Sequence, residues 1–150
     1  MSVSAVMRRA VGSDLAGLLD LYRHLHADDP VVAPAVAEAQ WAAILANPLL
    51  HYFVIEEAGM LVSTCTLSVI PNLTRGLRPY GLVENVVTHP DWRGRGLATQ
   101  LLHAARDAAW AAGCYKLMLM TSRKAPATLA FYERAGFIAG DKMAFVMRPE

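Results

Sequence analysis

Cysteine is scarce in this sequence, with two residues, Cys65 and Cys114, among 150. Two cysteines cannot build a disulfide framework, and neither lies in a CxxC pair or in a Cys/His cluster with the spacing of a metal site. Cys65 lies within an apolar run, so we expect it to be a small core residue. The sequence therefore predicts no bound metal and favours a reduced, cytoplasmic setting.

Long hydrophobic runs are also absent. The longest apolar stretch, residues 60–71, is interrupted by four hydroxyl side chains, those of Ser63, Thr64, Thr66 and Ser68. A membrane-spanning helix needs about 20 predominantly apolar residues, far more than this stretch supplies. Arg8 and Arg9 are followed only by short apolar stretches, so we expect neither a secretory signal nor a membrane partner.

Charge of either sign is in short supply. Charged residues make up 18% of the sequence, and 14 Lys and Arg against 13 Asp and Glu leave a net charge of +1. Nucleic-acid binding depends on a surplus of positive charge, so we expect no nucleic-acid partner. Hydrophobic residues make up 55%, which is typical of a folded core. We therefore expect one domain, residues 1–150, that buries about 70% of the surface its unfolded chain exposes.

Hydrophobic periodicity and turn residues predict the order of the elements. We predict strands at residues 3–11, at two places within 51–71, and at 82–90, 114–122 and 142–149. We predict helices at residues 15–25, 36–46, 94–112 and 126–136. The intervening segment 71–81, with two prolines, two glycines and an asparagine, is predicted to be a loop. This order favours an α/β domain with antiparallel hairpins first and a strand–helix–strand unit in the second half.

The helix predicted at residues 94–112 has a clear apolar face. Its inward stripe is expected to be Leu97, Leu101, Ala105, Ala108 and Ala112. Gly113 is the residue expected to end the helix. Trp110 falls on the outward face, where a large apolar side chain indicates a contact surface such as that of a homodimer.

The segment DWRGRGLATQLL, residues 91–102, places two arginines and two glycines directly before this helix. The first N–H groups of a helix lack intrahelical partners and carry partial positive charge. Glycines let a ligand approach the backbone, and arginines add positive potential, so residues 93–99 predict a phosphate site. The alternative is a strand-to-helix turn with solvated arginines. The pattern is neither the dinucleotide-binding G-x-G-x-x-G nor the P-loop, which disfavours those two folds.

Arg93-Gly94-Arg95-Gly96-Leu97-Ala98 matches the [Gln/Arg]-x-x-Gly-x-[Gly/Ala] pattern of the GNAT superfamily of acyl-CoA-dependent N-acyltransferases. The blocks AGCYKLMLM and FYERAGF resemble the next strand and the C-terminal helix of these enzymes, particularly the glucosamine-phosphate N-acetyltransferase branch. The close resemblance covers residues 80–137. It implies an α+β domain with a mixed, mostly antiparallel sheet of about six or seven strands, about four flanking helices, and splayed strands at the acyl-CoA cleft.

The resemblance implies acetyl-CoA as the acyl donor. Its pyrophosphate would lie on the main chain of Arg93, Gly94, Arg95, Gly96, Leu97, Ala98 and Thr99. Its pantetheine arm would run along Val86, Val87 and Thr88 as an added strand, beside a bulge that splays two strands. A backbone N–H near Val86 or Val87 would polarise the thioester carbonyl. The side chains of the two valines are expected to pack in the core.

Two residues are candidates for the chemistry. Tyr132, in the FYERAGF block, is implied to donate a proton to the CoA sulfur; alternatively its ring only packs on the sheet. Glu84 is the candidate general base, directly or through a water, unless it points to solvent or pairs with Arg78. Many relatives carry asparagine where this sequence has Ala125. Nearby, Arg123 or Lys124 either reaches the CoA 3′-phosphate or belongs to a solvated loop.

The acceptor side is marked by polar residues of the 71–81 loop. Asn72, Arg75 and Arg78 suit an acceptor with a carboxylate or phosphate, although a solubilising loop would carry similar residues. The expected function is therefore transfer of an acetyl group to a primary amine of a small molecule. Two alternatives stay open: a non-catalytic CoA-binding or sensing module, and a protein N-acetyltransferase. The sequence does not identify the amine.

Overall fold

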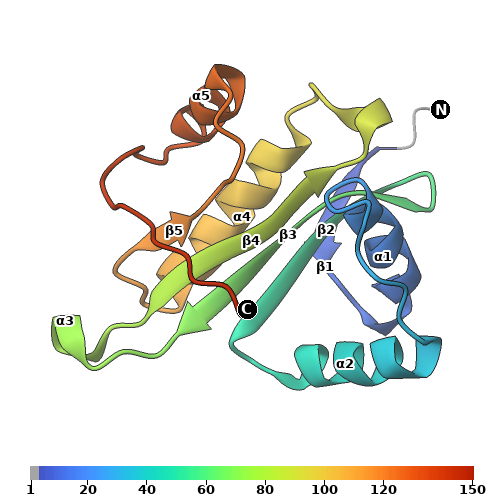
Figure 1. The fold of residues 1–150 in the computed structure, drawn as a ribbon, viewed down its shortest axis with the longest axis horizontal. Coiled ribbons are helices and arrows are strands. Elements are labelled where there is room, and N and C mark those ends of the chain that lie inside the picture. Colours follow the sequence, from blue (N-terminus) through green and yellow to red (C-terminus); the bar gives the residue numbers. More distant parts are fainter. Residues whose placement is uncertain (1–3) are drawn as a thin grey trace.

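The centre of the molecule is a five-stranded sheet, seen in a computed structural model that describes residues 4–150. The strands lie in the order β1 (Val6–Arg9), β2 (Leu50–Glu57), β3 (Met60–Ile70), β4 (Tyr80–Thr88) and β5 (Leu117–Leu119). The first four pair antiparallel, and β5 pairs parallel to β4. The helices are α1 (Leu15–Arg23), α2 (Pro34–Ala46), α3 (Thr74–Leu77), α4 (Leu97–Ala111) and α5 (Pro126–Arg134), as Figure 1 shows. The mixed, mostly antiparallel α+β architecture is confirmed.

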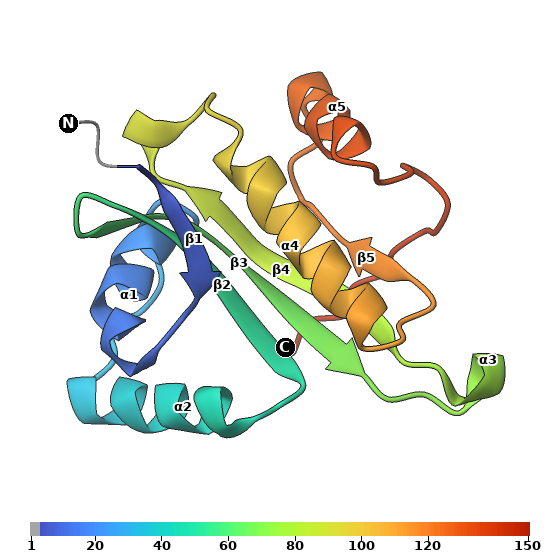
Figure 2. The same ribbon diagram turned by 180° about the vertical axis from the view of Figure 1, so that it is seen from behind.

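Helices cover both faces of the sheet, so two cores form. Figures 1 and 2 show α1 on one face and α4 on the other. On the α4 side, Leu101 and Leu102 are fully buried against Val62 and Leu67 of the sheet. On the α1 side, Leu18 and Leu21 pack with Trp41, whose indole N–H donates to the carbonyl of Gly12 at 3.1 Å. The middle strands β2 and β3 therefore contain most of the buried residues of the sheet, whereas β1 at the edge is mostly exposed.

The buried stripe of α4 differs in part from the expected one. Leu97, Leu101 and Ala105 are buried as predicted, but Leu102 and Ala109 complete the stripe. Ala112 is exposed, so its prediction is wrong, and Ala108 is only partly buried. A helical period of 3.6 residues carries the stripe on to Ala109. Trp110 faces outward as expected and is 50% exposed.

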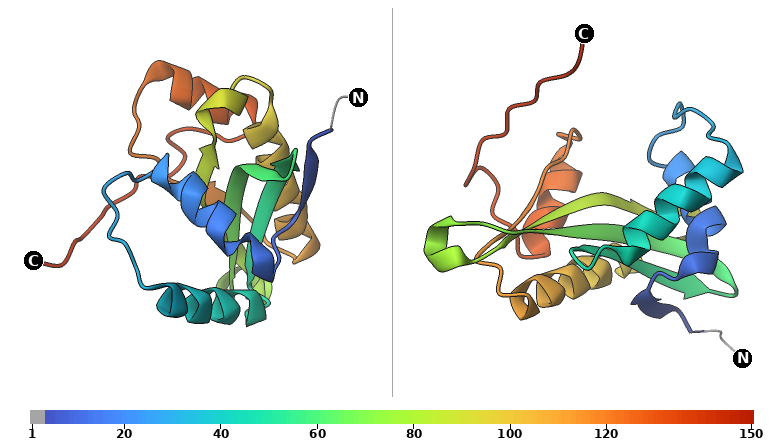
Figure 3. Two further views of the ribbon diagram at one scale, coloured as in Figure 1. Left: turned by 90° about the vertical axis from the view of Figure 1, so that its right-hand side faces the viewer. Right: turned by 90° about the horizontal axis from the view of Figure 1, so that it is seen from below.

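The sheet has fewer strands than expected. The segment 142–149, predicted to be a strand, forms none, so the described sheet has five strands rather than six or seven, with five helices rather than about four. A segment with alternating apolar residues forms a strand only where a neighbouring strand has a free edge to pair with it. The outermost strand on that side, β5, is only three residues long and gives little edge for pairing. Phe145 and Met147 are 89% and 98% exposed, and Figure 3 shows this end of the chain extending away from the sheet. Of the strand predicted at 3–11, residue 3 lies outside the described residues.

Candidate active site

A cleft opens where β4 and β5 diverge. β5 pairs only with the stretch 81–83 of β4, and within residues 4–150 no strand pairs with that edge of β4 from Glu84 to Thr88. A cavity of about 870 Å³ fills this gap and continues past the beginning of α4 to α5. Its volume lies in the range of small-molecule and cofactor sites. The splayed strands expected for an acyl-CoA cleft are thus present.

A bulge in β4 sets the direction of the residues that line the cleft. Thr64 pairs with Val87 and Thr66 with Glu84, so two residues of β4 oppose the single residue Cys65. Asn85, in the bulge, has a positive φ of 52°. Val83 packs in the α4-side core, so strand alternation places Glu84 on the face that α1 covers. The extra residue then brings Val87, three positions later, to the same face, where it packs in the α1-side core.

The arginine–glycine turn ends at the cleft, directly before α4. Gly94 and Gly96 have φ of 75° and 76°, the left-handed region that glycine adopts without strain. The first N–H that bonds within α4 is that of Gln100, to the carbonyl of Gly96 at 3.1 Å. The N–H groups of the preceding helical residues are therefore free of intrahelical partners. A Cβ added to either glycine would meet nothing within 4 Å, so a ligand has room beside the backbone.

Tyr132 lines the same cleft from α5. Its ring lies tilted against Phe131 at 5.0 Å and edge-on to Phe137 at 6.3 Å between ring centroids. The Tyr132 ring thus packs against its aromatic neighbours and also lines the cleft. Burial raises the pKa of the Tyr132 phenol, although the positive charge of Arg123 acts in the opposite direction. A neutral phenol keeps its proton and can donate it.

Glu84 lines the cleft from the middle of β4 and is exposed. Its carbonyl accepts a hydrogen bond from the Thr66 hydroxyl at 3.0 Å. Its carboxylate makes no ion pair with any residue of the range 4–150, Arg78 included. The carboxylate is thus available to a ligand in the cleft.

The three residues assigned to the acceptor do not line this cleft. They lie at the opposite end of β4: the Asn72 amide donates to the Thr74 hydroxyl at 2.8 Å, and Arg75 lies over the ring of Tyr115 at 5.8 Å. Arg78 is exposed on the same loop. The structure therefore separates Asn72, Arg75 and Arg78 from Glu84 and Tyr132.

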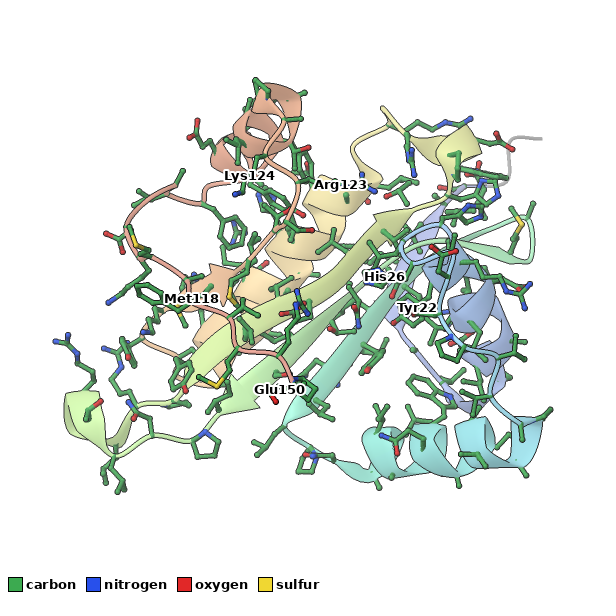
Figure 4. The ribbon with its side chains drawn as sticks, viewed as in Figure 1. Tyr22, His26, Met118, Arg123, Lys124 and Glu150 are labelled. Atoms are coloured by element: carbon green, nitrogen blue, oxygen red, sulfur yellow. The ribbon has the colours of Figure 1, made fainter. Side chains whose placement is uncertain are left out.

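Residues that the sequence did not single out line the cleft instead. His24 and His26, at the end of α1, face it, as does Trp92; Figure 4 labels His26 beside the sheet. No sequence pattern links the end of α1 to β4, so the sequence does not indicate that these histidines reach the cleft. Arg123 lines the cleft at the base of α5, where Figure 4 also labels the exposed Lys124.

Residues 4–150 contain no group of three or more His, Cys, Asp or Glu side chains placed to hold a metal ion. No helix among them is long and apolar enough to cross a bilayer.

Comparison with known proteins agrees with this geometry. The family model of the GNAT acetyltransferases matches residues 18–137, which include the splayed strands, the turn and α5. This chain belongs to the GNAT acetyltransferase family. It is an acetyl-CoA-dependent N-acetyltransferase.

Relatives of this acetyltransferase include a glucosamine 6-phosphate N-acetyltransferase of Trypanosoma brucei brucei, 33% identical over 87% of this chain and 86% of that protein. A solved structure from Agrobacterium tumefaciens str. C58, provisionally assigned as an acetyltransferase, is 46% identical with a TM-score of 0.90 and covers 96% and 99% of the two chains. A glucosamine-6-phosphate N-acetyltransferase of Arabidopsis thaliana shares the fold at 22% identity, with a TM-score of 0.85 over 98% of both chains.

Proposed function

We propose that this enzyme acetylates the primary amine of a small molecule of the amino-sugar phosphate class. One observation carries the proposal: Glu84 and Tyr132 line a single cleft together with the unpaired edge of β4 and the beginning of α4. The similarity to a glucosamine 6-phosphate N-acetyltransferase over 87% of the chain supports the acceptor class.

The binding site proposed for acetyl-CoA, called its seat below, is formed by free backbone groups of residues 86–88 and 93–99. Its diphosphate binds the N–H donors between Arg93 and Thr99, where the dipole of the 15-residue α4 favours negative charge. Its pantetheine arm takes the place of a strand along Val86, Val87 and Thr88. A backbone N–H at Val86 or Val87 then lies beside the thioester carbonyl and stabilises the oxyanion as it forms.

The reaction proposed is direct attack on the thioester. An alkylamine, with a pKa of about 10.4, is mostly protonated at neutral pH and must lose a proton before it can attack. Glu84 accepts that proton, directly or through a water. The amine nitrogen forms a bond to the carbonyl carbon and loses its second proton to solvent water as the carbon–sulfur bond breaks. Tyr132 donates its proton to the departing CoA thiolate and is reprotonated from solvent. The products are the acetamide and free CoA.

The proposal is tested by measuring free thiol released from acetyl-CoA with a panel of acceptors. Glucosamine 6-phosphate, glucosamine and a peptide with a free N-terminus separate the acceptor classes. We expect turnover with the phosphorylated amino sugar, and a kcat reduced about 100-fold or more in Tyr132→Phe. CoA binding without turnover on any amine would contradict the assignment in favour of a sensing module, and preferred acetylation of the peptide would favour a protein N-acetyltransferase.

A homodimer is proposed as the working assembly. Trp110 is half-exposed and borders a groove of about 710 Å³, which β5 and the residues after α5 also line. Exposed apolar grooves of this kind are covered in stable assemblies. Sedimentation at micromolar concentration should give twice the mass of one chain, and Trp110→Glu should shift the species toward the monomer. A monomeric wild-type protein would exclude this assembly.

A further inference from the structure

Glu57, the last residue of β2, reaches the arginine–glycine turn from another part of the chain. One oxygen of its carboxylate, Oε2, accepts a hydrogen bond from the indole N–H of Trp92 at 2.5 Å. The same oxygen lies 3.7 Å from Nη1 of Arg95. Glu57 and Trp92 are 35 positions apart, and β3 lies between β2 and β4, the strand that leads to Trp92. A single carboxylate thus links the β2–β3 hairpin to the turn that precedes α4.

The two arginines of the turn differ in their contacts. Arg95 is engaged by three neighbours: it pairs with Glu57, lies over the Trp92 ring at 5.9 Å and donates to the Asp91 carbonyl at 3.3 Å. Arg93 donates through Nε to the Thr88 carbonyl at 3.2 Å, and its terminal nitrogens have no partner within the range 4–150. Arg95 is therefore held by the protein, whereas Arg93 keeps donors for a ligand.

The turn needs such support because little else fixes it. The residues 93–96 are all exposed, and glycines at two of the four positions have the largest backbone freedom of any residue. Trp92, by contrast, is partly buried against the α4-side core, with the His89 ring edge-on at 4.9 Å. A turn that is ordered before the ligand arrives loses less conformational entropy on binding.

We propose that Glu57 is a positioning residue for acetyl-CoA: it fixes Trp92 and Arg95, and so holds the turn 93–96 in the shape that accepts the diphosphate. A carboxylate beside an anion site would repel the ligand if it acted directly, so its effect passes through the two side chains that it holds. The inference rests on the proposed seat of CoA at this turn.

The test measures the CoA dissociation constant and steady-state kinetics of Glu57→Ala, Glu57→Gln and Trp92→Phe. Loss of a hydrogen bond to a charged group should weaken CoA binding about tenfold in Glu57→Ala and in Trp92→Phe. Glu57→Gln keeps an acceptor for the indole and should stay within about threefold of wild type. In Glu57→Ala, whose side chain does not line the cleft, the KM for acetyl-CoA should rise while kcat and the KM for the amine stay unchanged. The double variant should bind no more weakly than Glu57→Ala, because the hydrogen bond that Trp92→Phe removes is one that Glu57→Ala has already removed.

Two controls separate the possible failures. Glu56→Ala removes the neighbouring carboxylate, which pairs with Arg8 at 2.6 Å, and should leave the KM for acetyl-CoA unchanged. Gly96→Glu tests the seat itself. Lost CoA binding in Gly96→Glu with wild-type binding in Glu57→Ala and Trp92→Phe would overturn the role of Glu57 alone. Wild-type CoA binding in Gly96→Glu would overturn the seat. A changed kcat with an unchanged KM for acetyl-CoA in folded Glu57→Gln would also overturn the inference.

Discussion

The two ends of β4 carry similar residues and form different structures. After Thr88 the chain makes the turn with Arg93, Gly94, Arg95 and Gly96, and this end lines the cleft. Before Tyr80 it makes the α3 loop with Arg75, Gly76 and Arg78, which lies outside the cleft. Arginine and glycine therefore do not by themselves make an anion site.

The helix attached to each set of residues makes the difference. α4 has 15 residues, so its peptide dipoles add up and its free N–H groups point to one place. α3 has four residues, and Arg75 and Gly76 inside it have left-handed backbone angles, so its peptides are not aligned. The anion site at one end of β4 thus depends on the long regular helix, which the other end lacks.

The largest expected effect comes from exchanging the equivalent glycines. Gly96→Glu places bulk and negative charge among the free N–H groups and should weaken CoA binding at least about 100-fold. Gly76→Glu is the matched control, because Gly76 has a φ of 68° close to the 76° of Gly96 and an added Cβ meets nothing at either position. Calorimetric titration with CoA measures both. Equal losses in the two variants would mean that backbone strain, not the anion site, causes the effect.

The next largest effect is expected to differ between two tyrosines, one near each end of β4. Tyr132→Phe should lower kcat about 100-fold or more, whereas Tyr115→Phe, beside the α3 loop, should change kcat by less than about twofold. Burial raises the pKa of Tyr132, so its neutral acid form persists to higher pH than that of a free tyrosine. Wild-type kcat should therefore fall only at strongly alkaline pH, and this fall should be missing in Tyr132→Phe. An unchanged pH profile of kcat in the variant would contradict the role of Tyr132 as the acid.

A smaller effect is expected from single arginines. Arg93→Ala should raise the KM for acetyl-CoA about tenfold at low ionic strength and less at high salt, because a phosphate contact is screened. Arg78→Ala at the other end should leave that KM unchanged. Initial rates of both variants, measured at two salt concentrations, give the KM values that test these expectations. A raised KM for the amine in Arg78→Ala would mean that the 71–81 loop does contribute to the acceptor site.

The smallest effect concerns the bulge between the two ends. Asn85 has a φ of 52°, a conformation that asparagine tolerates and a β-branched residue does not. Asn85→Val should lower the free energy of unfolding by about 1–2 kcal/mol, and Asn85→Gly should leave it nearly unchanged. Urea unfolding measures both variants. If valine were as stable as glycine there, the left-handed conformation of the bulge would be wrong.

Local patterns predict the structure correctly where the cause is local. The glycine-rich turn, the helix after it and the apolar strands depend on neighbours a few residues away, and the order predicted for them is the order observed. The prediction of a strand at 142–149 is wrong because its pattern is local but its pairing partner is not. For the same reason the sequence gives no sign of His24, His26 or Glu57 at the site: each meets it only after the sheet has assembled.

By itself, the sequence determined the order of the elements, the free N–H groups at the beginning of α4 and the presence of Glu84 and Tyr132, because backbone and periodicity act over short distances. Only the tertiary structure decided where β4 and β5 part, which face Glu84 takes and which arginines reach the cleft. Those outcomes depend on the register of β3 with β4 across the bulge and on the short pairing with β5. Register is a property of two strands together, and a one-residue shift reverses the face of every side chain beyond it.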